Sequence, residues 1–108
     1  SFSHVETITD AQLHRRDYNV VHQIMPNGQF GLTAFSGVFQ PDIDLPFLNC
    51  VDISQTSYRV NNDFSQHYNH YHCATLPIYD SSKNKMHTIF FGGIVSICNC
   101  MNLLCHVY

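Results

Sequence analysis

Residues 18–39 have the sequence YNVVHQIMPNGQFGLTAFSGVF, and this stretch decides the fold class. Its first eight residues are rich in β-branched and aromatic side chains, which favour strands. The Pro-Asn-Gly sequence at 26–28 predicts a tight turn, because proline sets φ and Asn-Gly tolerates positive φ. The segment that follows, 30–39, is again apolar and aromatic. The stretch therefore predicts a β-hairpin.

The rest of the chain continues this pattern of short strands between turn residues, without a long 3.6-residue period. The expected elements are a loop at 40–46, strands at 47–53 and 58–60 joined by a turn at 54–57, a strand at 71–79, a turn at 80–85 and a strand at 86–95. Within 71–79, Pro77 suits a sheet edge or a bulge. We expect an all-β fold of antiparallel hairpins, as in a sandwich, barrel or propeller.

The composition is that of one small globular domain or of a piece of a larger chain. The chain has 108 residues, of which 44% are hydrophobic and 12% are charged, and its net charge is -3. A nucleic-acid-binding protein needs a basic face, so this class is not expected. The first residues have neither a basic region nor an apolar run, so no signal peptide is expected among them. The most apolar stretch, 88–108, is interrupted by Gly, Asn and His, so no membrane span is expected.

The cysteines lie at positions 50, 73, 98, 100 and 105. Because five is an odd number, complete pairing within the chain is impossible. We expect free, mostly buried thiols that behave as small hydrophobic groups. A Cys50–Cys73 disulfide and a soft-metal site near the C-terminus are the alternatives.

A short motif occurs twice, 55 residues apart: TAFSGVF at 33–39 and TIFFGGI at 88–94. Each copy ends the second strand of an expected hairpin. A repeat of about 50 residues is typical of β-propellers.

With this repeat, the chain resembles kelch-type β-propellers. FFGG at 90–93 matches the diglycine that ends a kelch strand, and Ser36-Gly37 is a degenerate copy. CVD at 50–52 lies where the third strand and its Asp fall, and Tyr58 takes the usual Trp position. HCA at 72–74 resembles the start of the next repeat. The run from 61 into 93 is also similar to uncharacterised secreted or surface proteins of Bacteroidota-type bacteria.

The resemblance implies kelch-like propeller blades, or a fragment of a propeller, divided into four parts. These are an N-terminal extension at 1–16, a first blade-like unit at 17–60, a second, partial unit at 61–95 and an apolar, Cys-rich tail at 96–108. A propeller closes with about four to eight blades, so we expect either a part of a larger chain or a homo-oligomer. A compact sandwich that shares the pattern is the alternative. The tail does not continue the kelch pattern.

A propeller of this kind implies a non-catalytic binding or scaffold module without a cofactor, located outside the cell or on its surface. Its partner would be a protein or a carbohydrate. Catalysis has little support, because the chain has no Gly-x-Ser-x-Gly elbow and no phosphate-binding glycine loop. Candidate ligand-binding residues are Tyr68 and Tyr71, since tyrosine offers a flat apolar face with a polar tip, together with Asp42 and Asp44. Tyr58 and Tyr79 are further aromatic candidates.

The alternative function is a metal-binding domain, with hydrolytic activity as one form of it. It centres on QHYNHYHC at 66–73. If 70–72 is extended, His70 and His72 point to one face, and His67 joins them from the preceding loop. Three histidines and a water make a zinc site, and neutral imidazole also suits copper. The other interpretation is that these residues are half-exposed and hydrogen-bonded locally.

Overall fold

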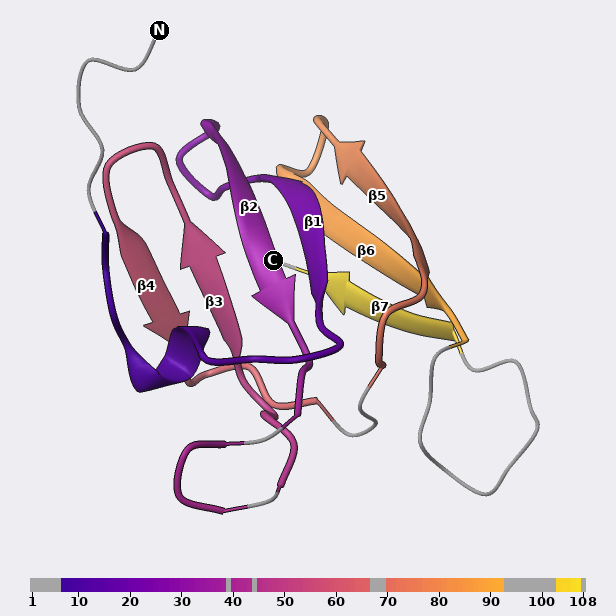
Figure 1. Ribbon diagram of the computed structural model, residues 1–108. Coiled ribbons are helices and arrows are strands. Elements are labelled where there is room, and N and C mark those ends of the chain that lie inside the picture. The colour runs from indigo at the N-terminus through magenta and orange to yellow at the C-terminus, as the bar shows by residue number, and fades with distance from the viewer. Residues whose placement is uncertain (1–6, 39, 44, 67–69, 93–102, 108) are drawn as a thin grey trace, which may run out of the picture.

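The computed structural model describes residues 7–38, 40–43, 45–66, 70–92 and 103–107. In these ranges the chain forms two antiparallel β-sheets and one short 3-10 helix, η1 (Ala11–Leu13) (Figure 1). The predicted all-β fold of antiparallel hairpins is confirmed.

The first sheet has four strands that follow one another in chain order. They are β1 (Asn19–Ile24), β2 (Phe30–Phe35), β3 (Cys50–Ile53) and β4 (Tyr58–Asn61). The β1–β2 turn is closed by the Met25 N–H, which donates to the Gln29 carbonyl at 2.8 Å, and Gly28 takes the positive φ of +85° that the Asn-Gly pair predicts. The hairpin therefore forms where the sequence places it.

Strand β2 ends at Phe35, four residues earlier than expected. Ser36 and Gly37 have φ angles of 64° and 105°, which turn the chain out of the strand. Gly37 is also tightly enclosed, because a Cβ there would lie 2.8 Å from the Cβ of Arg15. A glycine is therefore required at this position both for its backbone conformation and for the close approach of Arg15.

The second sheet has the strand order β5 (Ala74–Asp80), β6 (Lys85–Phe91) and β7 (Leu103–Val107). Strand β5 begins at Ala74 rather than at 71, because the Asn19 side chain holds the preceding residues. Its amide nitrogen donates to the His70 carbonyl at 2.8 Å, and its oxygen accepts from the Cys73 N–H at 3.0 Å. Pro77 lies on β5, an edge strand of this sheet, as expected.

Strand β7 lies in the tail at 96–108, for which the sequence predicted no strand. It pairs antiparallel with β6, from His87 opposite Val107 to Phe91 opposite Leu103. The tail therefore supplies the third strand of the second sheet, and this strand pairs with the edge of β6 that β5 leaves open.

The two sheets share one hydrophobic core. Its buried centre consists of Val21, Phe35, Cys50 and Phe90, with Phe64 and Cys73 packed against it. The rings of Phe35 and Phe90 meet edge to face, with centroids 5.1 Å apart. Since β1 also lies beside β5, the sheets form a single folded unit.

The repeated motif has equivalent surroundings in the two sheets. Its Thr is the fourth residue and its Phe the sixth residue of β2 and of β6, and all four side chains are fully buried. The glycine that follows has a positive φ in both copies, 105° at Gly37 and 82° at Gly92. The motif is thus a structural repeat. The assignment of the two sheets to propeller blades stays a prediction.

The N-terminal segment is fixed to the first sheet by a buried arginine. Arg15 donates from Nη1 to the Ser36 carbonyl at 2.8 Å and to the Asn49 carbonyl at 3.0 Å, and from Nη2 to the Asn49 side-chain oxygen at 2.9 Å. Its guanidinium carbon lies 4.3 Å from the centre of the Phe47 ring. Burial lowers the pKa of Arg15 to about 10, so the side chain stays charged at neutral pH.

A buried polar contact joins the two sheets across the core. The Gln23 side-chain amide on β1 donates to the Thr88 hydroxyl on β6 at 2.7 Å, and both residues are buried. We expect Thr88→Val to cost about 1–3 kcal/mol of unfolding free energy, because it leaves a buried amide without its acceptor. The double variant Gln23→Met/Thr88→Val should recover most of that loss, because both polar partners are then gone.

Urea denaturation of the wild type, the two single variants and the double variant measures this coupling. Strictly additive losses would contradict a direct hydrogen bond between the sheets.

Candidate functional site

His70 is a core residue. Its side chain is fully buried, and its ring stacks on Phe90 with centroids 5.3 Å apart. Nδ1 lies 2.9 Å from the Gly92 carbonyl, which fits an Nδ1–H donor. Nε2 is buried, and among the described residues it has no hydrogen-bond partner. The structure thus places His70 between the sheets, where it supports the packing.

His72 lies in a different environment from His70. Its side chain is exposed, and its backbone N–H donates to the Asp17 carbonyl at 3.1 Å. The two histidines do not share a strand face, because the strand begins only at Ala74. His67 lies outside the described residues. Within the described ranges, no three His, Cys, Asp or Glu side chains gather closely enough to hold a metal ion.

The other predicted ligand-binding residues do not gather into one site in the described part of the chain. Asp42 is exposed in the loop between β2 and β3, and Tyr71 is half-buried just before β5. Asp44 and Tyr68 lie outside the described residues. Neither Asp42 nor Tyr71 lines the hollows described below.

Cys50 and Cys73 are both free thiols, so the alternative of a disulfide between them is not found. Cys50 is buried on β3, and Cys73 is half-buried against the same core. Burial raises the pKa of the Cys50 thiol to about 12, and it also raises the pKa of Cys73. At these two positions the expectation of free thiols in hydrophobic surroundings is confirmed.

We expect Cys50 to resist alkylation by iodoacetamide at pH 8. With a pKa of about 12, only about one thiol in ten thousand is ionised at that pH, and the thiolate is the nucleophile. Peptide mapping by mass spectrometry should find Cys50 unmodified in the folded chain and fully modified after unfolding in urea, which serves as the control. Rapid labelling of Cys50 in the folded chain would contradict its burial.

The hairpin turns gather at one end of the molecule (Figure 1). They are the β1–β2 turn at 25–29, the β3–β4 turn at 54–57 and the β5–β6 turn at 81–84. The Asn84 side chain of the last turn donates to the Pro26 carbonyl of the first at 3.3 Å. This end therefore presents short turns from both sheets side by side.

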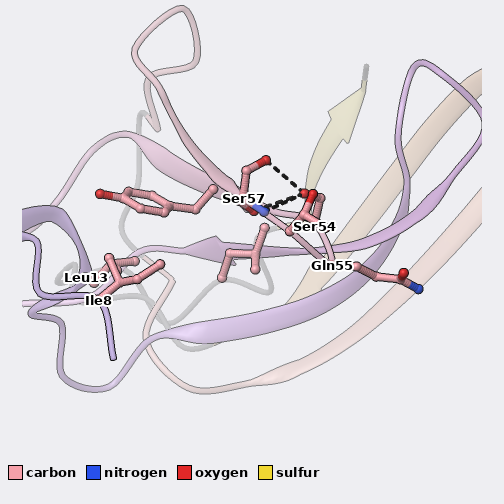
Figure 2. Close-up of a pocket in the computed structure, with 8 residues that line it drawn as sticks. Ile8, Leu13, Ser54, Gln55 and Ser57 are labelled. Carbon is pink, nitrogen blue, oxygen red and sulfur yellow. Dashed lines mark hydrogen bonds between the residues drawn. The ribbon is translucent and has the colours of Figure 1, made fainter. Parts of the chain in front are cut away.

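A hollow of about 540 Å³ lies between the N-terminal segment and the β3–β4 turn (Figure 2). Its lining combines apolar side chains with a hydroxyl-rich turn: Ile8, Leu13, Ile53, Ser54, Gln55, Thr56, Ser57 and Tyr58. In Figure 2, Ile8 and Leu13 lie together on one side, whereas Gln55 extends away from them at the other side. Pockets that bind small molecules have volumes of about 300–1,000 Å³, so this hollow has a suitable size.

The turn and the aromatic ring that line this hollow are held in place by hydrogen bonds. The hydroxyls of Ser54 and Ser57 lie 3.0 Å apart, and the Ser57 N–H donates to Ser54 Oγ at 3.1 Å (Figure 2). The Tyr58 hydroxyl donates to the Asp10 carboxylate at 2.7 Å. Asp10 also accepts from the Gln12 N–H, and these two bonds keep its pKa below the usual value. The hollow is therefore preformed.

Two further hollows adjoin the same turn. One, of about 510 Å³, is lined by Gln29, Phe30, Ser54, Gln55 and Thr56. The other, of about 460 Å³, lies between the β1–β2 and β3–β4 turns and includes the Asp52–Arg59 ion pair, with an N–O distance of 3.8 Å. All three hollows contain Ser54 and Thr56. We call the residues that line the hollows of about 540 and 510 Å³ the turn surface.

Phe30 is the most exposed large hydrophobic residue in the described part of the chain. Its side chain is 78% exposed, although it begins strand β2. A phenyl ring exposed to this degree beside a hollow is available for contact with a partner, because burying its apolar area in a complex is favourable.

Of the turn surface, the sequence indicated only Tyr58, which was among the aromatic candidates and lines the hollow of about 540 Å³. The four residues 54–57 were predicted only as a turn, and Phe30 only as the start of a strand. The available indications were the run of hydroxyl side chains just before Tyr58 and an aromatic residue directly after a tight turn. Ile8 and Leu13 also line the turn surface, but their place there depends on how the N-terminal segment packs, which the sequence pattern does not predict.

Comparisons with protein-family models, with curated proteins and with solved structures find no match to this chain. Over the described ranges, no helix has the length and apolar character needed to cross a membrane.

Proposed function

We propose that this chain is a non-catalytic binding module whose partner docks on the turn surface. One observation carries the proposal: preformed hollows adjoin on both sides of the β3–β4 turn, next to the highly exposed ring of Phe30. The hydroxyl and amide groups there form hydrogen bonds well but carry no activated nucleophile. The Ser54 and Ser57 hydroxyls bond to each other rather than to a general base.

The fold is suited to such a role because both sheets support the same end. Short turns on a rigid scaffold commonly carry binding residues. We further propose that the two sheets act as blade-like units of a kelch-like propeller. The chain-order arrangement of strands in both sheets and the position of β1 beside β5 support this.

The test is binding of the fluorescently labelled chain to a glycan array and to a peptide array. Thr56 is exposed and lines both hollows of the turn surface, so Thr56→Trp fills them without disturbing the core. Ser81→Trp, on the exposed β5–β6 turn outside the hollows, is the matched control.

We expect binding to one array, a loss of at least about tenfold in Thr56→Trp, and wild-type binding in Ser81→Trp. Absence of binding on both arrays, or full binding by Thr56→Trp, would contradict the proposal.

The second candidate function is zinc or copper binding centred on His67, His70 and His72. The buried Nε2 of His70 favours it, because the described part of the chain offers this atom no hydrogen-bond partner and a metal ligand needs a free ring nitrogen. A metal bound only to the folded chain raises the melting temperature, so a chelator should lower it. An unchanged melting temperature, with no metal in a native mass spectrum, would reject this candidate.

A further inference from the structure

We propose that the partner of the turn surface is an uncharged glycan, an inference that rests on the binding function proposed above. The first step of the argument is Phe30. Its ring is 78% exposed and lines a hollow together with two glutamines and two hydroxyl residues. The face of an aromatic ring is electron-rich, so it attracts the weakly positive C–H groups on the flat side of a sugar ring.

The second step is the polar rim around this ring. Gln29, Gln55, Ser54 and Thr56 are exposed on adjoining turns and line the same hollow as Phe30. Amide and hydroxyl groups can both donate and accept hydrogen bonds. Sugar hydroxyls also need donors and acceptors close together, so this rim matches them better than it matches an apolar ligand.

The third step is a second aromatic ring on the other side of the β3–β4 turn. Tyr58 lines the hollow of about 540 Å³, and its hydroxyl is fixed by Asp10 at 2.7 Å. A ring that is already held in place loses little conformational freedom on binding. Phe30 and Tyr58 therefore offer two aromatic surfaces on opposite sides of one hydroxyl-rich turn, an arrangement that suits a chain of several sugars.

The fourth step is charge. No Asp, Glu, Lys or Arg is among the residues that line the hollows of about 540 and 510 Å³, whereas the adjoining hollow of about 460 Å³ contains one acidic and one basic side chain, Asp52 and Arg59, which pair with each other. The whole chain carries a net charge of -3, so a polyanion such as an acidic polysaccharide would be repelled. The surface therefore favours a neutral glycan over a phosphorylated or acidic one.

The experiment begins with the glycan array and continues with titration calorimetry on the neutral glycan that binds best. Phe30→Ala removes the exposed ring, and folding should be unaffected because the ring is largely solvated. Ile43→Ala is the matched control, because Ile43 is also exposed, at 53%, but lies in the β2–β3 connection at the opposite end of the strands.

We expect a neutral glycan to bind and Phe30→Ala to raise its Kd at least about tenfold, while Ile43→Ala changes it less than about twofold. Wild-type affinity of Phe30→Ala overturns the glycan proposal, and so does binding confined to acidic glycans. Binding confined to peptides, and lost in Thr56→Trp, also overturns it but leaves the binding function standing. No binding on either array overturns both.

Discussion

Replacing Phe90 with alanine is expected to lower the free energy of unfolding by about 4 kcal/mol. Phe90 is fully buried, and the centre of its ring lies 5.1 Å from that of Phe35 and 5.3 Å from that of His70. Loss of the ring therefore leaves a cavity between the two sheets. Domains of this size are stable by about 5–15 kcal/mol, so the variant would keep only about 1–11 kcal/mol of that stability. Urea denaturation followed by circular dichroism measures the change.

The matched control for this variant is Phe91→Ala. Phe91 is the next residue on β6, and its side chain is 45% exposed on the opposite face. The same substitution there should cost much less, about 1 kcal/mol or below. Equal losses at the two positions would contradict a core shared by the two sheets.

Replacing Arg15 with alanine is expected to cost about 3 kcal/mol, although the residue lies outside every strand. The variant removes the three hydrogen bonds that Arg15 donates to Ser36 and Asn49. The backbone carbonyls of Ser36 and Asn49, which lie 2.8 and 3.0 Å from Arg15 Nη1, then lose this donor. It also removes the contact with the Phe47 ring. Arg15→Lys should recover only part of the loss, because an ammonium group cannot reproduce the planar guanidinium geometry.

Arg16→Ala serves as the control for the Arg15 variant. Arg16 is an exposed neighbour, and substitutions of exposed residues usually change stability by about 0.5 kcal/mol or less. The melting temperatures of the three variants give the comparison. A small effect of Arg15→Ala would show that the N-terminal segment is not needed to hold the first sheet together.

The hairpins could be predicted because their determinants are local. The Pro-Asn-Gly turn at 26–28 and the alternation of apolar residues around it depend on neighbouring residues alone. The strand boundaries were less predictable, because long-range contacts set them. Strand β5 starts at Ala74 because Asn19, more than fifty residues earlier, holds His70 and Cys73.

The repeated motif was found in the sequence, but the direction in which it faces was not. Phe35 and Phe90 meet each other across the core. Blades related by rotation around a ring turn equivalent faces in the same direction, so equivalent residues of two blades would not face each other. The contact between the two phenylalanines therefore marks the core between the sheets. The proposal of blade-like units rests on the order of the strands and not on this contact. Residue spacing cannot reveal which faces of two sheets come together.

The candidate sites show the same limit. The histidine cluster looked like one chemical site because its members are close in sequence, yet His70 is buried and His72 is exposed. The turn surface, in contrast, brings together residues from positions 8 to 58. Its polar members are ordinary turn residues, so only their arrangement in space distinguishes them.

Hydrogen–deuterium exchange of the chain, with and without the partner found on the arrays, tests the location of the binding surface most directly. We predict slower exchange in the backbone amides of 27–30 and 54–58, where the β1–β2 and β3–β4 turns form the turn surface. The loop at 40–43, at the other end of the strands, should exchange as before. Protection confined to that opposite end, with unchanged exchange at 54–58, would contradict the account.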